Sequence, residues 1–125
     1  MQIQVHQKAG GWTLIEIMIA VSLIGLLAGI SVPSMFKARD VTYLNSIYSN
    51  LRLIDDVKEQ WAMEAVVGVG AEPRAEDLAV YFRGNTFPQP IIGESYSINE
   101  LGQPATAEIP IAIGDLPAGS IISRP

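Results

Sequence analysis

A run of twenty residues without a charged side chain decides the fold. Residues 17–36 are IMIAVSLIGLLAGISVPSMF. Twenty helical residues rise about 30 Å, which matches the hydrocarbon thickness of a bilayer. The run is apolar on every face, whereas a helix on the surface of a soluble domain has a polar face. The alternative is a buried core helix, but so short a chain covers such a helix poorly. We therefore predict a membrane-spanning helix.

Composition excludes several classes of function. The 125 residues include 13 acidic and 8 basic side chains, one histidine (His6) and no cysteine. Disulfides, thiolate metal sites and cysteine nucleophiles are therefore excluded, and a lone histidine argues against zinc sites and histidine-dependent triads. The acidic balance argues against nucleic acid as a partner. We expect no enzymatic activity and no cofactor, because the acidic pairs Asp55–Asp56 and Glu76–Asp77 lack a partner base. We also expect no metal, because the acidic residues near the C-terminus are too sparse to predict a calcium site.

Three kinds of membrane segment fit the apolar run: a removed secretory signal, a plain anchor, or a segment processed at its front end. A secretory signal has an apolar core of about 7–15 residues followed by a small-x-small cleavage motif. Here the run is longer, and the triplet Ala20-Val21-Ser22 lies in its middle. A plain anchor explains the length but not the sequence that precedes it.

The preceding sequence points to proteolytic processing. A polar leader, MQIQVHQKAGG, ends at Gly11 and is followed by WTLIE, residues 12–16. Glycines keep the backbone extended, as a protease cleft requires. A carboxylate in a membrane helix costs about 2.5–3.5 kcal/mol on insertion scales, so Glu16 calls for a partner. Cleavage after Gly11 would supply the new ammonium of Trp12, either at i,i+4 spacing in the same chain or from a neighbouring copy.

These residues resemble a known family. Lys8-Ala9-Gly10-Gly11 followed by WTLIE is similar to the class III leader of type IV pilins and type II secretion pseudopilins, with Trp12 in place of the usual Phe. The resemblance extends to Gly25 and Pro33 and covers residues 8 to about 36. It implies that a prepilin peptidase cuts between Gly11 and Trp12 and N-methylates Trp12, and that Glu16 pairs with the N-terminus of an adjacent subunit.

The resemblance also implies a location and partners. It places the N-terminus in the cytoplasm and the C-terminal domain in the periplasm of a bacterium, with a single pass through the inner membrane. The positive charges alone do not set this orientation, because Lys8 precedes the run and Lys37 and Arg39 follow it. The implied partners are copies of the chain and other pilin-like subunits in a helical filament, the prepilin peptidase, an inner-membrane assembly platform and, before assembly, membrane lipid.

Three residues make the apolar helix weak at one place. Pro33 has no N–H group, so the carbonyl of Gly29 loses its helical partner. Gly25 and Gly29 have GxxxG spacing, which allows another helix to approach closely. We expect residues 25–33 to kink or melt when helices pack into a filament. The alternative is that glycine and proline are merely tolerated in a membrane helix.

The remaining residues predict a small α+β domain. Apolar residues recur at steps of three and four along a helix expected over 37–67, which should end near residues 66–70. A short helix is expected over 75–82, with Leu78, Tyr81 and Phe82 on one face. Residues 96–98 and 106–109 predict a hairpin, and the tail from 111 adds an edge strand or packs irregularly, giving a small sheet within 94–125. The apolar stripe of the long helix comprises Val41, Leu44, Ile47, Leu51, Ile54, Val57, Trp61 and Ala65. The charged residues expected on its solvated face are Arg52, Asp55, Asp56, Lys58 and Glu59. On that face we expect Arg52 to pair with Asp55 or Asp56.

The predicted organisation is a leader at 1–11, a transmembrane and assembly helix at 12–36, and a periplasmic pilin-like domain at 37–125. The segments NLRLIDDVKEQWAMEA, EDLAVYF and YSIN-x-LG look more loosely similar to short pseudopilin-like proteins. The expected function is a structural subunit of a secretion pseudopilus. One alternative is a type IV pilus pilin. A rival from another class is a monomeric, membrane-anchored periplasmic binding module.

Overall fold

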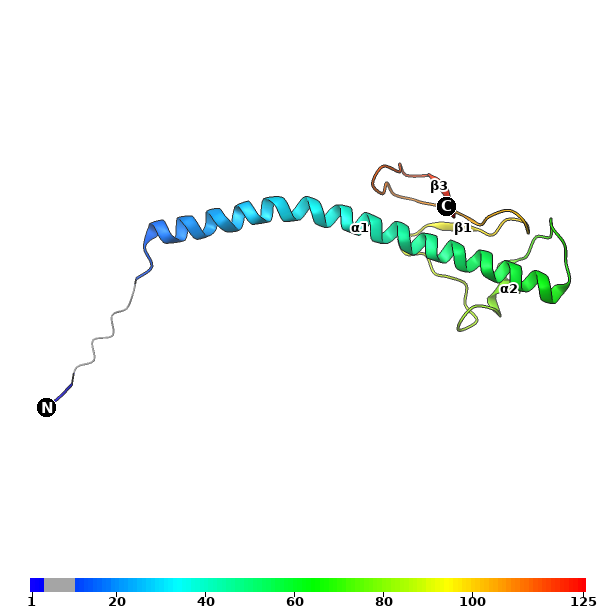
Figure 1. Cartoon of the computed structure of the whole chain (residues 1–125), viewed down its shortest axis with the longest axis horizontal. Coiled ribbons are helices and arrows are strands. Elements are labelled where there is room, and N and C mark those ends of the chain that lie inside the picture. The colour runs from blue at the N-terminus through cyan, green and yellow to red at the C-terminus, as the bar shows by residue number, and fades with distance from the viewer. Residues whose placement is uncertain (4–10) are drawn as a thin grey trace. The chain divides into compact units, whose positions relative to one another are not determined.

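The computed structural model describes residues 1–3 and 11–125. One long helix, α1 (Leu14–Ala65), is followed by a short helix, α2 (Ala75–Ala79), and three strands. The strands are β1 (Ser95–Ser97), β2 (Thr106–Glu108) and β3 (Ile121–Ser123) (Figure 1). The chain divides into two units, Met1–Phe36 and Lys37–Pro125, and α1 contributes residues to both. The predicted division at residue 36 coincides with this boundary.

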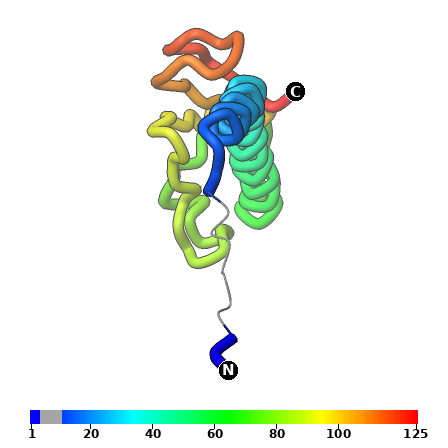
Figure 2. Tube along the Cα trace, turned by 90° about the vertical axis from the view of Figure 1, so that its left-hand side faces the viewer, coloured from blue at the N-terminus to red at the C-terminus, as the bar shows by residue number. Residues whose placement is uncertain are grey.

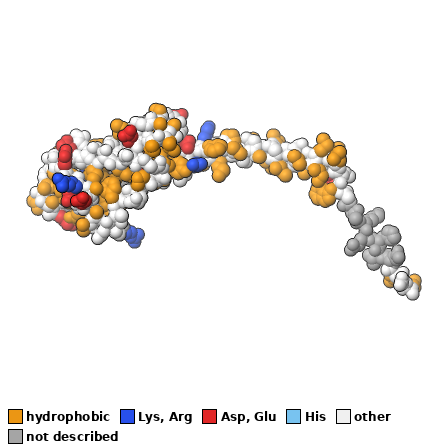
Figure 3. Space-filling view, turned by 180° about the vertical axis from the view of Figure 1, so that it is seen from behind, with side chains coloured by type: hydrophobic (Ala, Val, Ile, Leu, Met, Phe, Trp, Pro, Cys, Tyr) orange, Lys and Arg blue, Asp and Glu red, His pale blue; other side chains and the backbone are white. Residues whose placement is uncertain are grey.

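In the first unit, α1 exposes apolar side chains on all sides. Every residue from 14 to 36 is exposed except Ala20, which is half-buried. Apolar side chains follow this part of α1 in Figure 3. The segment is long and apolar enough to cross a membrane, and its most apolar stretch is 0% buried. This exposure argues against a buried core helix.

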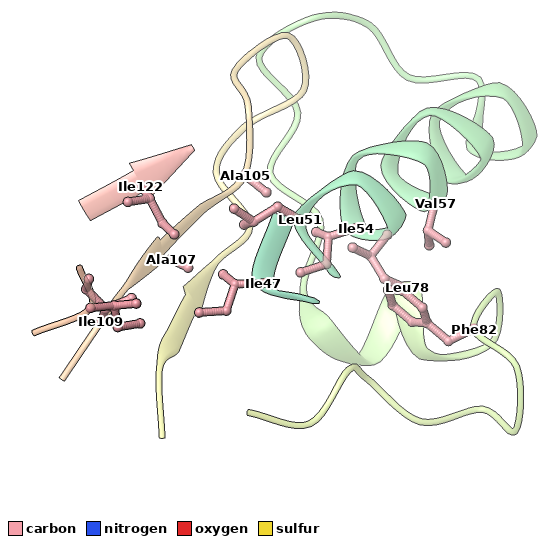
Figure 4. Close-up of a cluster of buried hydrophobic side chains, with 11 residues drawn as sticks. Ile47, Leu51, Ile54, Val57, Leu78, Phe82, Ala105, Ala107, Ile109 and Ile122 are labelled. Carbon is pink, nitrogen blue, oxygen red and sulfur yellow. The ribbon is translucent and has the colours of Figure 1, made fainter. Parts of the chain in front are cut away.

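In the second unit, the middle of the predicted apolar stripe forms the core. Ile47, Leu51, Ile54 and Val57 are buried, and Figure 4 shows them pointing toward α2 and the sheet. Leu44 and Trp61 are half-buried. The prediction is wrong at both ends of the stripe, because Val41 and Ala65 are exposed. Three-residue strands and a five-residue α2 are too short to cover seven helical turns.

The prediction of a solvated charged face is wrong for two residues. Asp55 and Lys58 are only 8% and 3% exposed. Asp55 Oδ1 accepts a hydrogen bond from the Ala105 N–H at 2.9 Å, and Lys58 Nζ donates to the carbonyls of Ile98 and Gln103 at 2.8 and 2.6 Å. The two charges lie 3.5 Å apart, Nζ to Oδ1. The 98–105 loop thus covers a side of α1 that the sequence pattern marks as polar.

The ion pairs predicted for Arg52 on the charged face are not found among the described residues. Arg52, Asp56 and Glu59 are exposed as expected. Within residues 1–3 and 11–125, however, Arg52 forms no ion pair with Asp55 or Asp56. Asp55 instead pairs with Lys58, because both side chains lie beneath the 98–105 loop.

The long helix ends two residues earlier than predicted. Val66 adopts a left-handed conformation with φ 53°, which a β-branched residue enters at a cost, and this stops α1 at Ala65. The N–H of Val67 returns to the carbonyl of Ala62 at 3.2 Å. The following loop pairs with the 98–105 loop through backbone hydrogen bonds, Gly70 N–H to Leu101 O at 3.0 Å and Leu101 N–H to Ala71 O at 2.8 Å.

Helix α2 is also shorter than predicted. It ends at Ala79, and the N–H groups of Tyr81 and Phe82 donate three residues back, to Leu78 at 3.0 Å and to Ala79 at 3.2 Å. This tighter winding replaces the last expected α-helical turn. The predicted apolar face still forms, since Leu78 and Phe82 are buried and Tyr81 is half-buried.

The three strands form one antiparallel sheet in the order β1-β2-β3. The predicted hairpin is confirmed, with β1 one residue earlier than expected, and the tail supplies β3 as an edge strand. Tyr96, Ala107 and Ile122 lie in register across the sheet and are its more buried row. This row faces the core of α1, so the expected α+β layout of a long helix against a small sheet is confirmed. Figure 2 shows the sheet and loops beside α1.

Candidate processing and assembly segment

The peptide bond that the leader resemblance marks for cleavage lies in an exposed stretch. His6 and the leader residues Lys8, Ala9 and Gly10 lie outside the described residues. Gly11 and Trp12 precede α1 in non-helical conformation. Nothing lies within 4 Å of a Cβ built on Gly11, and Trp12 is 70% exposed. An exposed, non-helical bond can enter a protease cleft without local unfolding.

Thr13 begins the helix, a role that the sequence analysis missed. Its Oγ1 accepts a hydrogen bond from the Glu16 N–H at 3.3 Å. Its carbonyl accepts from the N–H groups of Glu16 and Ile17 at 3.0 and 3.3 Å. The signal was present, because threonine followed three residues later by glutamate is the pattern of a helical N-terminus. The start of the apolar helix is therefore fixed by Thr13, close to the predicted cut.

Glu16 lies in the first turn of α1 and is exposed. A carboxylate there is stabilised by the positive end of the helix dipole. Because α1 begins at Leu14, Trp12 precedes the helix. The predicted i,i+4 pair needs the ammonium that cleavage would create at Trp12, so it stays a prediction. The alternative, a pair between Glu16 and the N-terminus of a neighbouring copy, does not require Trp12 to be helical.

The predicted weak segment is helical in this structure. Gly25, Gly29 and Pro33 all lie inside the uninterrupted helix α1. No atom lies within 4 Å of a Cβ built on either glycine, so this face is open to another helix. The hydroxyls of Ser22 and Ser31 donate to carbonyls four residues earlier, at 2.7 and 2.9 Å, which satisfies them in an apolar medium. The expected loosening of residues 25–33 concerns the assembled state and stays a prediction.

The most buried carboxylate of the second unit, Glu94, holds neighbouring segments together through hydrogen bonds. Glu94 is 2% exposed. Its oxygens accept hydrogen bonds from the N–H groups of Ile91 and Ile92, at 2.9 Å each, and from the hydroxyl of Tyr96. Asn50 on α1 donates in turn to that hydroxyl at 2.9 Å. The network ties the 91–94 turn and β1 to the long helix.

This network shifts two pKa values in opposite directions. Burial alone would raise the pKa of the Glu94 carboxyl, but the hydrogen bonds from Tyr96, Ile92 and Ile91 favour the charged form and lower it. Burial raises the pKa of the Tyr96 hydroxyl, and so does the hydrogen bond that this hydroxyl donates to Glu94. At neutral pH the pair is therefore a carboxylate accepting from a neutral phenol.

The acidic pairs singled out from the sequence have other roles or none. Asp55 holds Lys58 and the Ala105 N–H, and Asp77 accepts from the Arg74 N–H at 3.0 Å to begin α2. Asp56 and Glu76 are exposed. Among residues 1–3 and 11–125, no three His, Cys, Asp or Glu side chains are grouped so that they could hold a metal ion.

Comparison of this chain with protein-family models, with curated proteins and with solved structures gives no match.

Proposed function

We propose that this chain is the precursor of a pilin-like filament subunit, acting in a secretion pseudopilus. Its role is structural rather than catalytic. The observation that carries the proposal is the junction at the start of α1: an exposed Gly11–Trp12 bond, a helix that begins at Leu14, and a carboxylate in its first turn. A plain membrane anchor needs none of these three features.

Processing comes first. A prepilin peptidase cuts after Gly11 at the cytoplasmic face of the inner membrane and N-methylates Trp12. The cut removes the polar leader and leaves the apolar helix at the new N-terminus. Because Thr13 already begins the helix, the bond is cut without disturbing the membrane segment.

Assembly then replaces lipid contacts with helix contacts. The exposed apolar surface of residues 14–36 leaves the bilayer and packs against the same surface of other copies. Glycines 25 and 29 allow close approach, and Pro33 allows the segment to loosen. Glu16 pairs with the amine of an adjacent subunit, which fixes the register. Copies joined head to tail by one repeated contact give an open filament.

The cleavage step is tested with Gly11→Lys in cells that contain a prepilin peptidase. We expect the parent to shorten by the eleven leader residues and the variant to keep them, as measured by mass analysis of the mature N-terminus. Gly68→Lys, in an open loop of the second unit, is the matched control and should be processed normally. A Gly11→Lys protein that matures and forms filaments like the parent would contradict the proposal.

The assembly step is tested with Glu16→Ala, which should still insert in the membrane but form no filaments. Glu59→Ala removes an exposed carboxylate from the same helix and should assemble normally. Filament yield is measured by electron microscopy of sheared fractions, and insertion by resistance to alkaline extraction. Equal filament yields from Glu16→Ala and the parent would reject the charge pair, whereas no filaments from either protein would favour the monomeric anchored module.

A further inference from the structure

A pocket of about 290 Å³ lies in the second unit between α1 and the chain that follows β3. From α1 it is lined by residues 45, 48, 49 and 52, whose spacing places them on one face of the helix. This face is turned away from Ile47, Leu51 and Ile54, which fill the core. The other wall is formed by Arg124 and Pro125.

The lining side chains are cationic or neutral, and none is acidic. Arg52 and Arg124 contribute two guanidinium groups, and Asn45, Tyr48 and Ser49 contribute an amide and two hydroxyls. Within the described ranges 1–3 and 11–125, neither arginine forms an ion pair, and the only one found joins Lys58 to Asp55. Two guanidinium groups that line one pocket and form no ion pair with the described residues are available to an external acceptor.

The pocket carries two of the exposed cations of an acidic domain. Residues 37–125 contain 12 acidic and 7 basic side chains, and one of the seven, Lys58, is buried. Of the six exposed cations, Arg52 and Arg124 line this pocket. Guanidinium groups bind carboxylates through paired hydrogen bonds, which makes a carboxylate the preferred occupant.

We infer that this pocket binds a carboxylate of a second copy of the chain. The inference rests on the proposed filament function, which brings copies of one acidic domain together. Domains of the same sign repel, and a local cationic pocket that receives a neighbour's carboxylate turns part of that repulsion into attraction. The contact joins two different surfaces of the same chain, so it repeats along an open assembly.

The test compares two double variants of the full chain that lose the same charge. Arg52→Gln/Arg124→Gln removes both guanidinium groups from the pocket, and Arg74→Gln/Arg83→Gln removes two exposed ones that do not line it. The measurement is the expression level at which filaments first form in cells that contain the prepilin peptidase. The pocket variant loses two partly exposed ion pairs, so we expect it to need a roughly tenfold higher expression level before filaments form. The control should assemble at the parent level.

A second variant keeps both arginines and blocks the pocket. Ser49→Glu places a carboxylate of the same chain among the guanidinium groups, and Gln60→Glu adds the same charge elsewhere on α1. We expect Ser49→Glu to raise the filament threshold severalfold and Gln60→Glu to leave it unchanged. All substituted positions are exposed, and near-ultraviolet circular dichroism of the purified proteins checks that each domain is folded.

The outcomes separate this inference from the function on which it rests. If the parent chain forms no filaments at any level, the proposed function fails and the pocket contact fails with it. If the parent assembles but either pocket variant assembles at the parent level, the pocket contact alone is overturned. A raised threshold for both pocket variants, with both controls unchanged, supports it.

Discussion

The two halves of α1 differ in how their apolar residues are distributed. Residues 17–36 are apolar on every face and almost all exposed, whereas residues 41–65 carry an apolar stripe whose middle residues, Ile47, Leu51, Ile54 and Val57, are buried. The second half finds its partners within the same chain, in α2 and the three strands. The first half finds none among the described residues of its own unit, so its apolar surface needs lipid or another apolar partner. The helix α1 thus joins a half that packs within its own domain to a half whose apolar surface must be covered from outside.

The largest expected effect concerns this contrast directly. Leu51→Ala removes a fully buried side chain from the centre of the core, and such substitutions cost about 2–5 kcal/mol of unfolding free energy. Leu26→Ala makes the same change in the exposed half of the helix and should leave the unfolding of the domain unaltered. Denaturant unfolding in detergent micelles, followed by near-ultraviolet circular dichroism, measures both. Similar losses for the two variants would show that the halves do not fold independently.

The next effect tests the buried charges that the sequence pattern placed on the surface. Lys58→Met leaves Asp55 without its cation and the carbonyls of Ile98 and Gln103 without their donor. Removing one partner of a buried pair costs about 3–5 kcal/mol, and we expect a loss near the lower end because the Ala105 N–H still binds Asp55. Arg52→Met, on the exposed face, should change stability by less than about 0.5 kcal/mol. The same unfolding measurement distinguishes them, and equal small losses would mean that the 98–105 loop is held without Lys58.

Periodicity predicted what depends on residues close together in sequence. The buried stripe of α1 and the hairpin between β1 and β2 follow from spacing of three, four or two, and the exposed apolar half of α1 follows from an uncharged run long enough to form a helix. Periodicity failed where distant segments meet. Asp55 and Lys58 are buried by a loop more than 40 residues away, and no local pattern announces that loop. The predicted burial at the two ends of the stripe was wrong for the same reason, because the length of α1 that is covered depends on the strands and on α2.

The candidate site was predictable to a similar degree. Gly11, Trp12 and Glu16 stand out because a glycine and a carboxylate flank an uncharged run. Thr13 does not stand out from the residues around it. Its role in beginning α1 could be inferred only from its position three residues before Glu16. The pocket around Arg52 and Arg124 could not be predicted, because it depends on where the residues after β3 return to α1.

The smallest effect is a pH dependence of the folded half alone. The pKa of Glu94 is lower in the folded domain than its usual value of 4.5, so the unfolded chain binds more protons as the pH falls. The stability that Glu94 provides is therefore complete above the unfolded pKa and is lost as the pH falls through the folded value. Glu94→Gln should flatten the decline of unfolding free energy below about pH 4.5, whereas Glu108→Gln, at an exposed site, should leave its slope unchanged. The measurement is denaturant unfolding at a series of pH values. Equal slopes for Glu94→Gln and the parent would show that the Tyr96 hydroxyl and the 91–92 backbone hold the protonated acid as well as the carboxylate, which would contradict the lowered pKa of Glu94.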